Sequence, residues 1–227
     1  MFKKGVTPGL DIITYTGTLT TAGTIAKTHN LGVAPAMFFA KSLNTNGSDV
    51  GNVFLWHQSL GANKFMRLNT TDGITDTVAT GGGTLAVPTS TQINLTWNSG
   101  SNVSGNNYVA YIFAEVPGFS KFGSYTGNGN ADGPFVYTGF RPAFILAKRI
   151  DAAGNSWRVW DVARDPYNPI THGIYTEFTG PEDAGFPWDM LSNGFKLRTA
   201  NAGDNATGGT YIYAAFASNP FKNANAR

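Results

Sequence analysis

The residues best suited to chemistry lie in the second half of the chain. Arginine, aspartate and tryptophan alternate over Trp157–Asp165, and an acidic pair follows at Glu182 and Asp183. Two carboxylates beside aromatic rings are the groups that glycoside hydrolases use. However, adjacent Glu182 and Asp183 would point to opposite sides of an extended chain, and surface arginine–aspartate pairs are common. We therefore expect no enzymatic activity.

Other catalytic and metal-binding patterns are absent from the sequence. The histidines at positions 29, 57 and 172 lie outside any His-Glu-x-x-His motif, and there is no Gly-x-Ser-x-Gly elbow or calcium-binding loop. The chain contains no cysteine, so neither disulfides nor thiolate metal sites can form. The sequence predicts no catalytic residue, no metal site and no cofactor.

Aromatic residues outside the apolar strands offer a different chemistry, the stacking of rings on sugars or on partner surfaces. Tyr167 and Trp188 lie in stretches rich in proline and aspartate, which favours exposed loops. The candidate receptor-contact residues of this region are Tyr167, His172, Glu182, Asp183 and Trp188. The alternative is that these loops pack against a neighbouring subunit.

An internal repeat positions these residues. The segment 102–117 returns with changes at 205–220, and Tyr15-Thr-Gly17 returns as Tyr125-Thr-Gly127. The repeat length of about 100 residues is a common domain size. Trp56 and Trp160 occupy matched positions in apolar strands, which predicts that both belong to cores.

The two copies differ most between the matched strands. The second copy carries Asp165–Pro169 and Gly180–Trp188, whereas the corresponding region 69–91 of the first copy is a threonine- and glycine-rich stretch. Elaborated loops on one copy of a duplicated scaffold indicate that this copy makes the specific contact.

The composition is typical of β-structure. The chain has 28 glycines and only 13% charged residues, with many threonines and asparagines. We predict an all-β protein made of two tandem homologous β-sandwich domains of jelly-roll-like character. The expected boundaries are an N-terminal attachment arm at residues 1–12, a first repeat at 13–118, a second at 119–222 and a C-terminal tail at 223–227.

Short apolar runs bounded by turn residues mark the expected strands. In the first half they are 11–16, 36–41, 53–57, 64–68, 92–97 and 108–114, and in the second half 123–125, 135–138, 144–149, 158–161, 173–177, 195–198 and 210–217. The sequons at Asn102 and Asn205 precede matched strands, so we interpret them as turns and not as glycosylation sites.

Charge and hydropathy exclude two classes of partner. The net charge of +2 is small and the basic residues are scattered, which argues against a nucleic acid partner. No apolar run is long enough for a membrane helix, and the first residues lack a secretory signal, so no membrane insertion is expected.

Three segments resemble a family of viral proteins. Residues 119–143, 191–198 and 208–217 are similar to the repeated β-rich domain of virion and tail-fibre-like proteins of tailed bacteriophages. The resemblance implies a structural virion component, first of all a tail fibre or receptor-binding protein that contacts a glycan or protein on the host surface. It also implies other virion proteins of the tail, baseplate or capsid as partners, assembly in the host cytoplasm and a homo-oligomer, for which a trimer is common.

Two other functions remain open at this stage. A capsid decoration or head-fibre protein would need no host ligand, and a surface-polysaccharide depolymerase would need the carboxylate pairing that is weak here. In a tail fibre or a capsid decoration protein, the N-terminal arm would attach the protein to the particle. The candidate docking residues of that arm are Phe2, Lys3, Lys4 and Leu10.

Overall fold

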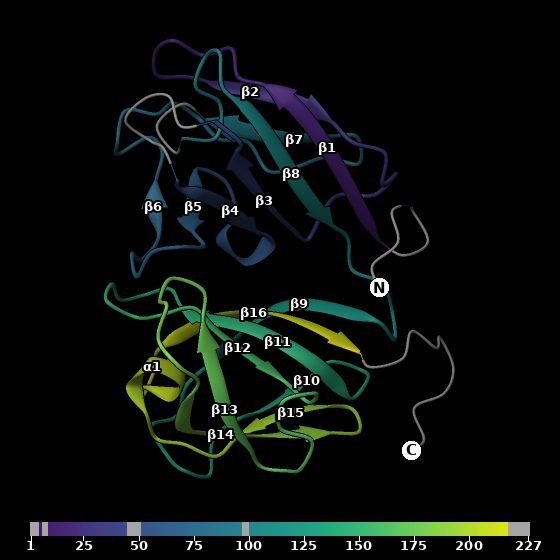
Figure 1. Cartoon of the computed structure of the whole chain (residues 1–227), viewed down its shortest axis with the longest axis vertical. Coiled ribbons are helices and arrows are strands. Elements are labelled where there is room, and N and C mark those ends of the chain that lie inside the picture. Colours follow the sequence, from purple (N-terminus) through teal and green to yellow (C-terminus); the bar gives the residue numbers. More distant parts are fainter. Residues whose placement is uncertain (1–4, 6–8, 45–50, 97–99, 218–227) are drawn as a thin grey trace. The chain divides into compact units, whose positions relative to one another are not determined.

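The protein is almost entirely β-structure (Figure 1). The computed structural model describes residues 5, 9–44, 51–96 and 100–217. Strands make up 47% and helices 3% of the structure, which confirms the all-β prediction. Within these residues the helical elements are the 3-10 turn η1 (Gln58–Leu60) and the single turn α1 (Ala202–Asn205). No helix in the described ranges has the length and apolarity needed to span a lipid bilayer.

The chain forms two compact units. Unit 1 contains Met1–Asn69 and Ile74–Glu115, and unit 2 contains Thr70–Gly73 and Val116–Arg227. In unit 1, six strands form one sheet in the order β1-β8-β3-β4-β5-β6, and β2 pairs with β7. The strands of unit 1 are β1 (Leu10–Thr16), β2 (Thr24–Thr28), β3 (Met37–Ser42), β4 (Val53–His57), β5 (Lys64–Arg67), β6 (Thr75–Asp76), β7 (Gln92–Thr96) and β8 (Asn107–Phe113).

Unit 2 contains one continuous sheet. Its eight strands follow the order β10-β15-β14-β13-β12-β11-β16-β9, and every pairing is antiparallel. The strands are β9 (Ser120–Thr126), β10 (Phe135–Tyr137), β11 (Pro142–Arg149), β12 (Arg158–Asp161), β13 (Ile170–Tyr175), β14 (Asp183–Leu191), β15 (Gly194–Leu197) and β16 (Thr210–Ala217).

The strand orders of the two units correspond. Each unit pairs its first strand with its last and the last with its third, and the fourth, fifth and sixth strands then follow in order. The units differ at the sixth strand, which has two residues in β6 and nine in β14. Because β14 is long enough to pair with β15, the second unit joins into one sheet, whereas β2 and β7 stay a separate pair.

A pair of stacked tyrosines recurs in both units. Tyr15 stacks on Tyr108 with ring centroids 5.1 Å apart, and Tyr125 stacks on Tyr211 at 4.8 Å. In each pair the earlier tyrosine donates its hydroxyl to a backbone carbonyl, and the later one accepts a backbone N–H. The repeated Tyr-Thr-Gly and Asn-x-Ser/Thr-Gly segments therefore build the same hydrogen-bonded joint twice.

The two sequon asparagines are structural residues of this joint. Asn102 and Asn205 are both 0% exposed, and the Oδ1 of each accepts a backbone N–H, at 3.2 Å from Thr18 and 2.7 Å from Asn128. Turns follow at 104–105 and 207–208, each closed by a backbone hydrogen bond, which confirms the interpretation of both segments as turns. Their Nδ2 groups differ: that of Asn205 donates to three acceptors, whereas that of Asn102 has no partner among the described residues.

Most of the expected strands are present, and three were missed. The predictions for 53–57, 158–161 and 210–217 match β4, β12 and β16. The strand expected at 92–97 is β7 as far as residue 96; Trp97 lies outside the described residues, as do the C-terminal positions 218–227. The strands that the sequence did not indicate are β2, β6 and β14.

Strand β14 was missed because its sequence looks like a loop. Gly185 and Pro187 weaken a strand prediction, since proline cannot donate to a ladder. Here Pro187 lies beside a register shift between Ile170 and His172 on the neighbouring strand, where the ladder is interrupted. Pairing with β13 and β15 on both sides then holds the segment extended.

Tryptophans anchor the core of each unit. Trp56 is 4% exposed and donates its Nε1–H to the carbonyl of Gly61, and Trp160 is 0% exposed, so both are core residues as predicted. The prediction that Trp188 is exposed is wrong. It is 0% exposed and stacks on Trp160 at 4.0 Å and on Phe195 at 5.0 Å, because β14 turns its side chain into the sheet's buried face.

Candidate functional site

An exposed tyrosine stands on a loop that is fastened to the sheet of unit 2. We call Asp165–Pro169 the Tyr167 loop. Tyr167 is 81% exposed, the largest fraction among the large apolar side chains that the structure describes. The prediction that it is exposed is confirmed. An exposed ring is a plausible contact group only if the backbone that carries it is held in place, so the anchors of the loop matter.

Asp165 fastens the first end of the loop to the start of β13. Its Oδ2 accepts hydrogen bonds from the backbone N–H of Thr171 at 2.6 Å and of His172 at 3.3 Å, and lies 3.0 Å from His172 Nδ1. The hydrogen bond from the Thr171 N–H is the main cause that lowers the pKa of Asp165 to about 2, with further bonds from His172 opposing the effect of burial. The carboxylate is therefore ionised at any physiological pH.

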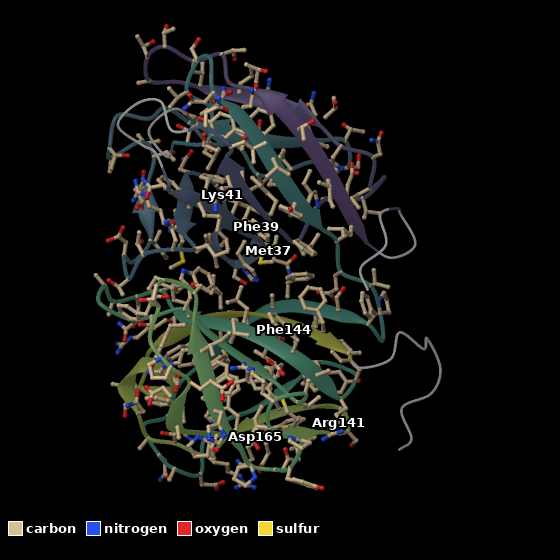
Figure 2. The ribbon with its side chains drawn as sticks, viewed as in Figure 1. Met37, Phe39, Lys41, Arg141, Phe144 and Asp165 are labelled. Atoms are coloured by element: carbon tan, nitrogen blue, oxygen red, sulfur yellow. The ribbon has the colours of Figure 1, made fainter. Side chains whose placement is uncertain are left out.

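Asn168 fastens the other end of the loop to β14. Its Oδ1 accepts the backbone N–H of Met190 at 2.9 Å, and its Nδ2 donates to the Met190 carbonyl at 2.9 Å. Arg141, the residue before β11, donates its Nε–H to the same carbonyl at 3.3 Å. Figure 2 labels Arg141 and Asp165 in unit 2. Tyr167 thus lies between two anchored residues, Asp165 and Asn168, and Arg141 shares an acceptor with the second of them.

His172 lies on the surface beside this loop and is hydrogen bonded to Asp165. Its side chain is 46% exposed, and its Nδ1 faces Asp165. The neighbouring hydroxyl of Thr171 lies 3.3 Å from the same nitrogen and also bonds Asp165. A nucleophile activated by a His–Asp pair must meet the other ring nitrogen. The arrangement holds the imidazole in place and offers Nε2 to a ligand as a hydrogen-bonding group.

The two acidic candidates are held by different partners. Glu182 Oε1 lies 3.3 Å from Arg164, which also pairs with Asp161 at 2.5 Å. Asp183 accepts the hydroxyl of Tyr175. Burial acts to raise the pKa of Asp161, but the hydrogen bonds from Arg164 outweigh it and the pKa is lowered. The carboxylates therefore serve as anchors for strands β12, β13 and β14.

A buried ion pair behind this surface was not foreseen from the sequence. Arg158 pairs with Asp204, and their side chains are 11% and 4% exposed. The guanidinium lies 3.6 Å from the ring centroid of Phe186 and 5.5 Å from that of Tyr175. Burial raises the pKa of Asp204 to about 6, although Arg158 opposes the shift. The partners are 46 positions apart in the sequence, so no local pattern could have revealed the pair.

The docking candidates of the N-terminal arm have mixed outcomes. Phe2, Lys3 and Lys4 lie outside the described residues. Leu10 begins β1, pairs with Phe113 and is 4% exposed. The expectation that Leu10 is available for docking is therefore wrong, because the first strand of unit 1 begins two residues before the expected end of the arm and buries it.

Comparisons with known proteins place the chain in a family without assigning a function. Within the described residues, no group of three or more histidine, aspartate and glutamate side chains could hold a metal ion. No curated protein and no solved structure matches the chain. A family model matches residues 4–220, which is nearly the whole sequence. The chain therefore belongs to the family described as domain of unknown function (DUF7483).

Proposed function

We propose that this chain is a structural component of a tailed-bacteriophage virion, a tail fibre or receptor-binding protein that contacts the host surface through the Tyr167 loop. The observation that carries the proposal is the 81% exposure of Tyr167 on a loop whose two anchors, Asp165 and Asn168, are both hydrogen bonded to the sheet. A ring fixed in this way loses little conformational entropy on binding, as in other aromatic contact residues. The contact is one of binding and involves no catalysis.

We also propose that the two units are tandem homologous β-sandwich domains of jelly-roll-like character that arose by duplication. The corresponding strand orders and the two tyrosine stacks support this proposal, together with the repeated sequence segments. In this view the first domain keeps the basic scaffold, and the second has acquired the host contact by extension of β14 and the loop that β14 holds.

The direct test is binding of the labelled full-length chain to a panel of bacterial strains, measured by flow cytometry. Tyr167→Ala should abolish binding to the strains that the unmodified chain labels. Phe178→Ala is the matched control, since Phe178 is 55% exposed and lies outside the loop. Equal loss in both variants, or none in Tyr167→Ala, would contradict the assignment of the loop as the contact.

Location in the particle tests the broader proposal. Immunogold labelling of intact particles with an antibody against unit 2 should mark the tail or baseplate. Label spread over the head would instead support the capsid decoration or head-fibre function and remove the need for a host ligand. Crosslinking and light scattering of the purified chain test the expected homo-oligomer, for which we propose a trimer.

A further inference from the structure

Arg141 shares a backbone hydrogen-bond acceptor, the Met190 carbonyl, with Asn168 of the Tyr167 loop. Its side chain is exposed, and its Nε–H donates to the Met190 carbonyl, which also accepts from Asn168. Because Arg141 and Asn168 share one acceptor atom, the guanidinium lies beside the residue that follows Tyr167. Within the described residues Arg141 makes no ion pair and no other hydrogen bond.

No carboxylate among the described residues forms an ion pair with Arg141. The carboxylate nearest in the loop, Asp165, forms hydrogen bonds to Thr171 and His172 and no ion pair with Arg141. The other described arginines of unit 2 are all paired with carboxylates: Arg149 with Asp151, Arg158 with Asp204, Arg164 with Asp161 and Glu182, and Arg198 with Asp189 and Asp132. Arg141 is therefore the one described arginine of unit 2 that forms no ion pair with a described carboxylate.

We infer that Arg141, Tyr167 and His172 form a binding site for an anionic sugar residue of a surface polysaccharide. The Nη groups of a guanidinium oriented through its Nε match a carboxylate or phosphate in a bidentate pair. The Tyr167 ring offers a flat apolar face for the C–H groups of a pyranose, and His172 offers a ring nitrogen to a hydroxyl. This inference rests on the proposed host contact and specifies its ligand class.

The site requires a charged sugar, because its guanidinium binds an anion, its tyrosine ring contacts an apolar face and its imidazole bonds a hydroxyl. A neutral sugar would use the tyrosine and histidine but would leave the arginine without an ionic partner. A protein ligand would have to fit an isolated ring and an isolated charge, whereas one acidic pyranose presents both an apolar face and an anion within a single residue. The expected ligand therefore carries an anionic group, either a carboxylate or a phosphate, on a pyranose ring or on the linkage between rings.

The test is the affinity of the purified full-length chain for three immobilised polymers, measured by biolayer interferometry. The probes are a polyuronate, a glycerol-phosphate polymer and a neutral dextran. The unmodified chain should bind at least one anionic polymer and not dextran, and the preferred one identifies carboxylate or phosphate. Arg141→Gln should weaken that binding about tenfold or more, as expected for a lost charge-assisted hydrogen bond. Arg141→Lys should weaken the binding less, because lysine keeps the positive charge but cannot form the bidentate pair.

The matched control is Arg149→Gln at the other end of β11. Arg149 already pairs with Asp151 at 2.7 Å, so its loss should leave the affinity unchanged. Equal weakening by both variants would show general charge attraction and overturn the site. Equal binding to dextran and the anionic polymers would also overturn it.

The failure of this inference is distinguishable from failure of the host contact. If Tyr167→Ala abolishes cell labelling while Arg141→Gln does not, the host contact stands and the anionic-sugar site is wrong. If the chain binds the polyuronate in an Arg141-dependent manner but labels no strain of the panel, the site stands and the proposed host contact fails for those strains.

Discussion

The two units share a strand order but differ in what their sixth strand does. In unit 1, β6 has two residues and pairs only with β5 among the described strands. In unit 2, β14 has nine residues and lies between β13 and β15. The longer strand gives unit 2 a continuous sheet, a buried Trp188 and, through Met190, an anchor for the Tyr167 loop.

The difference teaches where new function can be added to such a scaffold. A tyrosine stack and a buried asparagine that accepts a backbone N–H recur at matched positions in both units. The changes lie at the opposite side of the sheet, around the fifth and sixth strands. An extension there leaves the shared joint intact and supplies both a packing residue and a support for a surface loop.

The largest expected effect is the loss of Trp188. Trp188→Ala should lower the free energy of unfolding by about 3–5 kcal/mol, because a fully buried ring that stacks on Trp160 and Phe195 leaves a large cavity. Urea denaturation, monitored by circular dichroism, measures this change in the free energy of unfolding. Trp188→Phe should lower the free energy of unfolding by less, because phenylalanine fills part of the cavity. An unfolding curve for Trp188→Ala that overlays the unmodified chain would show that β14 is not needed for the core of unit 2.

The two units also differ in the burial of a lysine that follows an alanine at the end of an apolar run. Lys148 is 1% exposed and donates to the carbonyls of Thr70, at 3.2 Å, and of Asn155, whereas Lys41, which also follows an alanine at the end of an apolar run, is exposed. Figure 2 labels Lys41 on unit 1. Lys148→Met should cost about 2–4 kcal/mol, because two partly buried carbonyl groups lose their hydrogen-bond donor. Lys41→Met should change stability by less than about 0.5 kcal/mol. Urea unfolding of the two variants should rank them in this order, and equal costs would contradict the structural difference.

The same lysine predicts a pH dependence for unit 2. Burial lowers the pKa of Lys148 from 10.5 to about 8, although Glu177 and Asp72 oppose the shift. Between these values the unfolded chain binds more protons than the folded one, so the contribution of Lys148 to stability rises with pH across that window. The unfolding free energy of the unmodified chain relative to Lys148→Met should therefore increase from about pH 7.5 to about pH 9.5. A constant difference would rule out the shift.

The matched asparagines should differ by a smaller amount. Asn205→Ala removes an acceptor for Asn128 and a donor to three oxygens, and should cost about 2–3 kcal/mol. Asn102→Ala removes one accepted hydrogen bond and an Nδ2 that has no partner among the described residues, so it should cost about 1 kcal/mol. Thermal unfolding of the two variants checks the order. A larger cost at Asn102 would mean that its amide is satisfied by a group such as bound water.

The smallest expected effect on stability belongs to Tyr167. Tyr167→Ala should change the free energy of unfolding by less than about 0.5 kcal/mol, because the ring is 81% exposed and the loop is held by its neighbours. Urea unfolding alongside Trp188→Ala separates the two aromatics that the sequence placed in one group. A marked destabilisation would mean that the ring packs on the unit and is not free for a ligand.

The sequence by itself determined the β-structure, most strand positions and the burial of Trp56 and Trp160. These features follow from residue type and local alternation, since apolar runs between turn residues specify strands wherever they lie. The exposure of Tyr167 was also predictable from its proline- and aspartate-rich context. The same reasoning failed for Trp188, whose context looks equally loop-like.

Only the tertiary structure decided which of these similar contexts became buried. Trp188 is in the core because β13 and β15 flank its strand, and Arg158 finds Asp204 across 46 positions of sequence. Lys41 and Lys148 follow the same local pattern, yet only Lys148 meets the segment 70–73 that covers it. Burial depends on what packs against a residue from elsewhere in the chain, and local sequence carries no record of that partner.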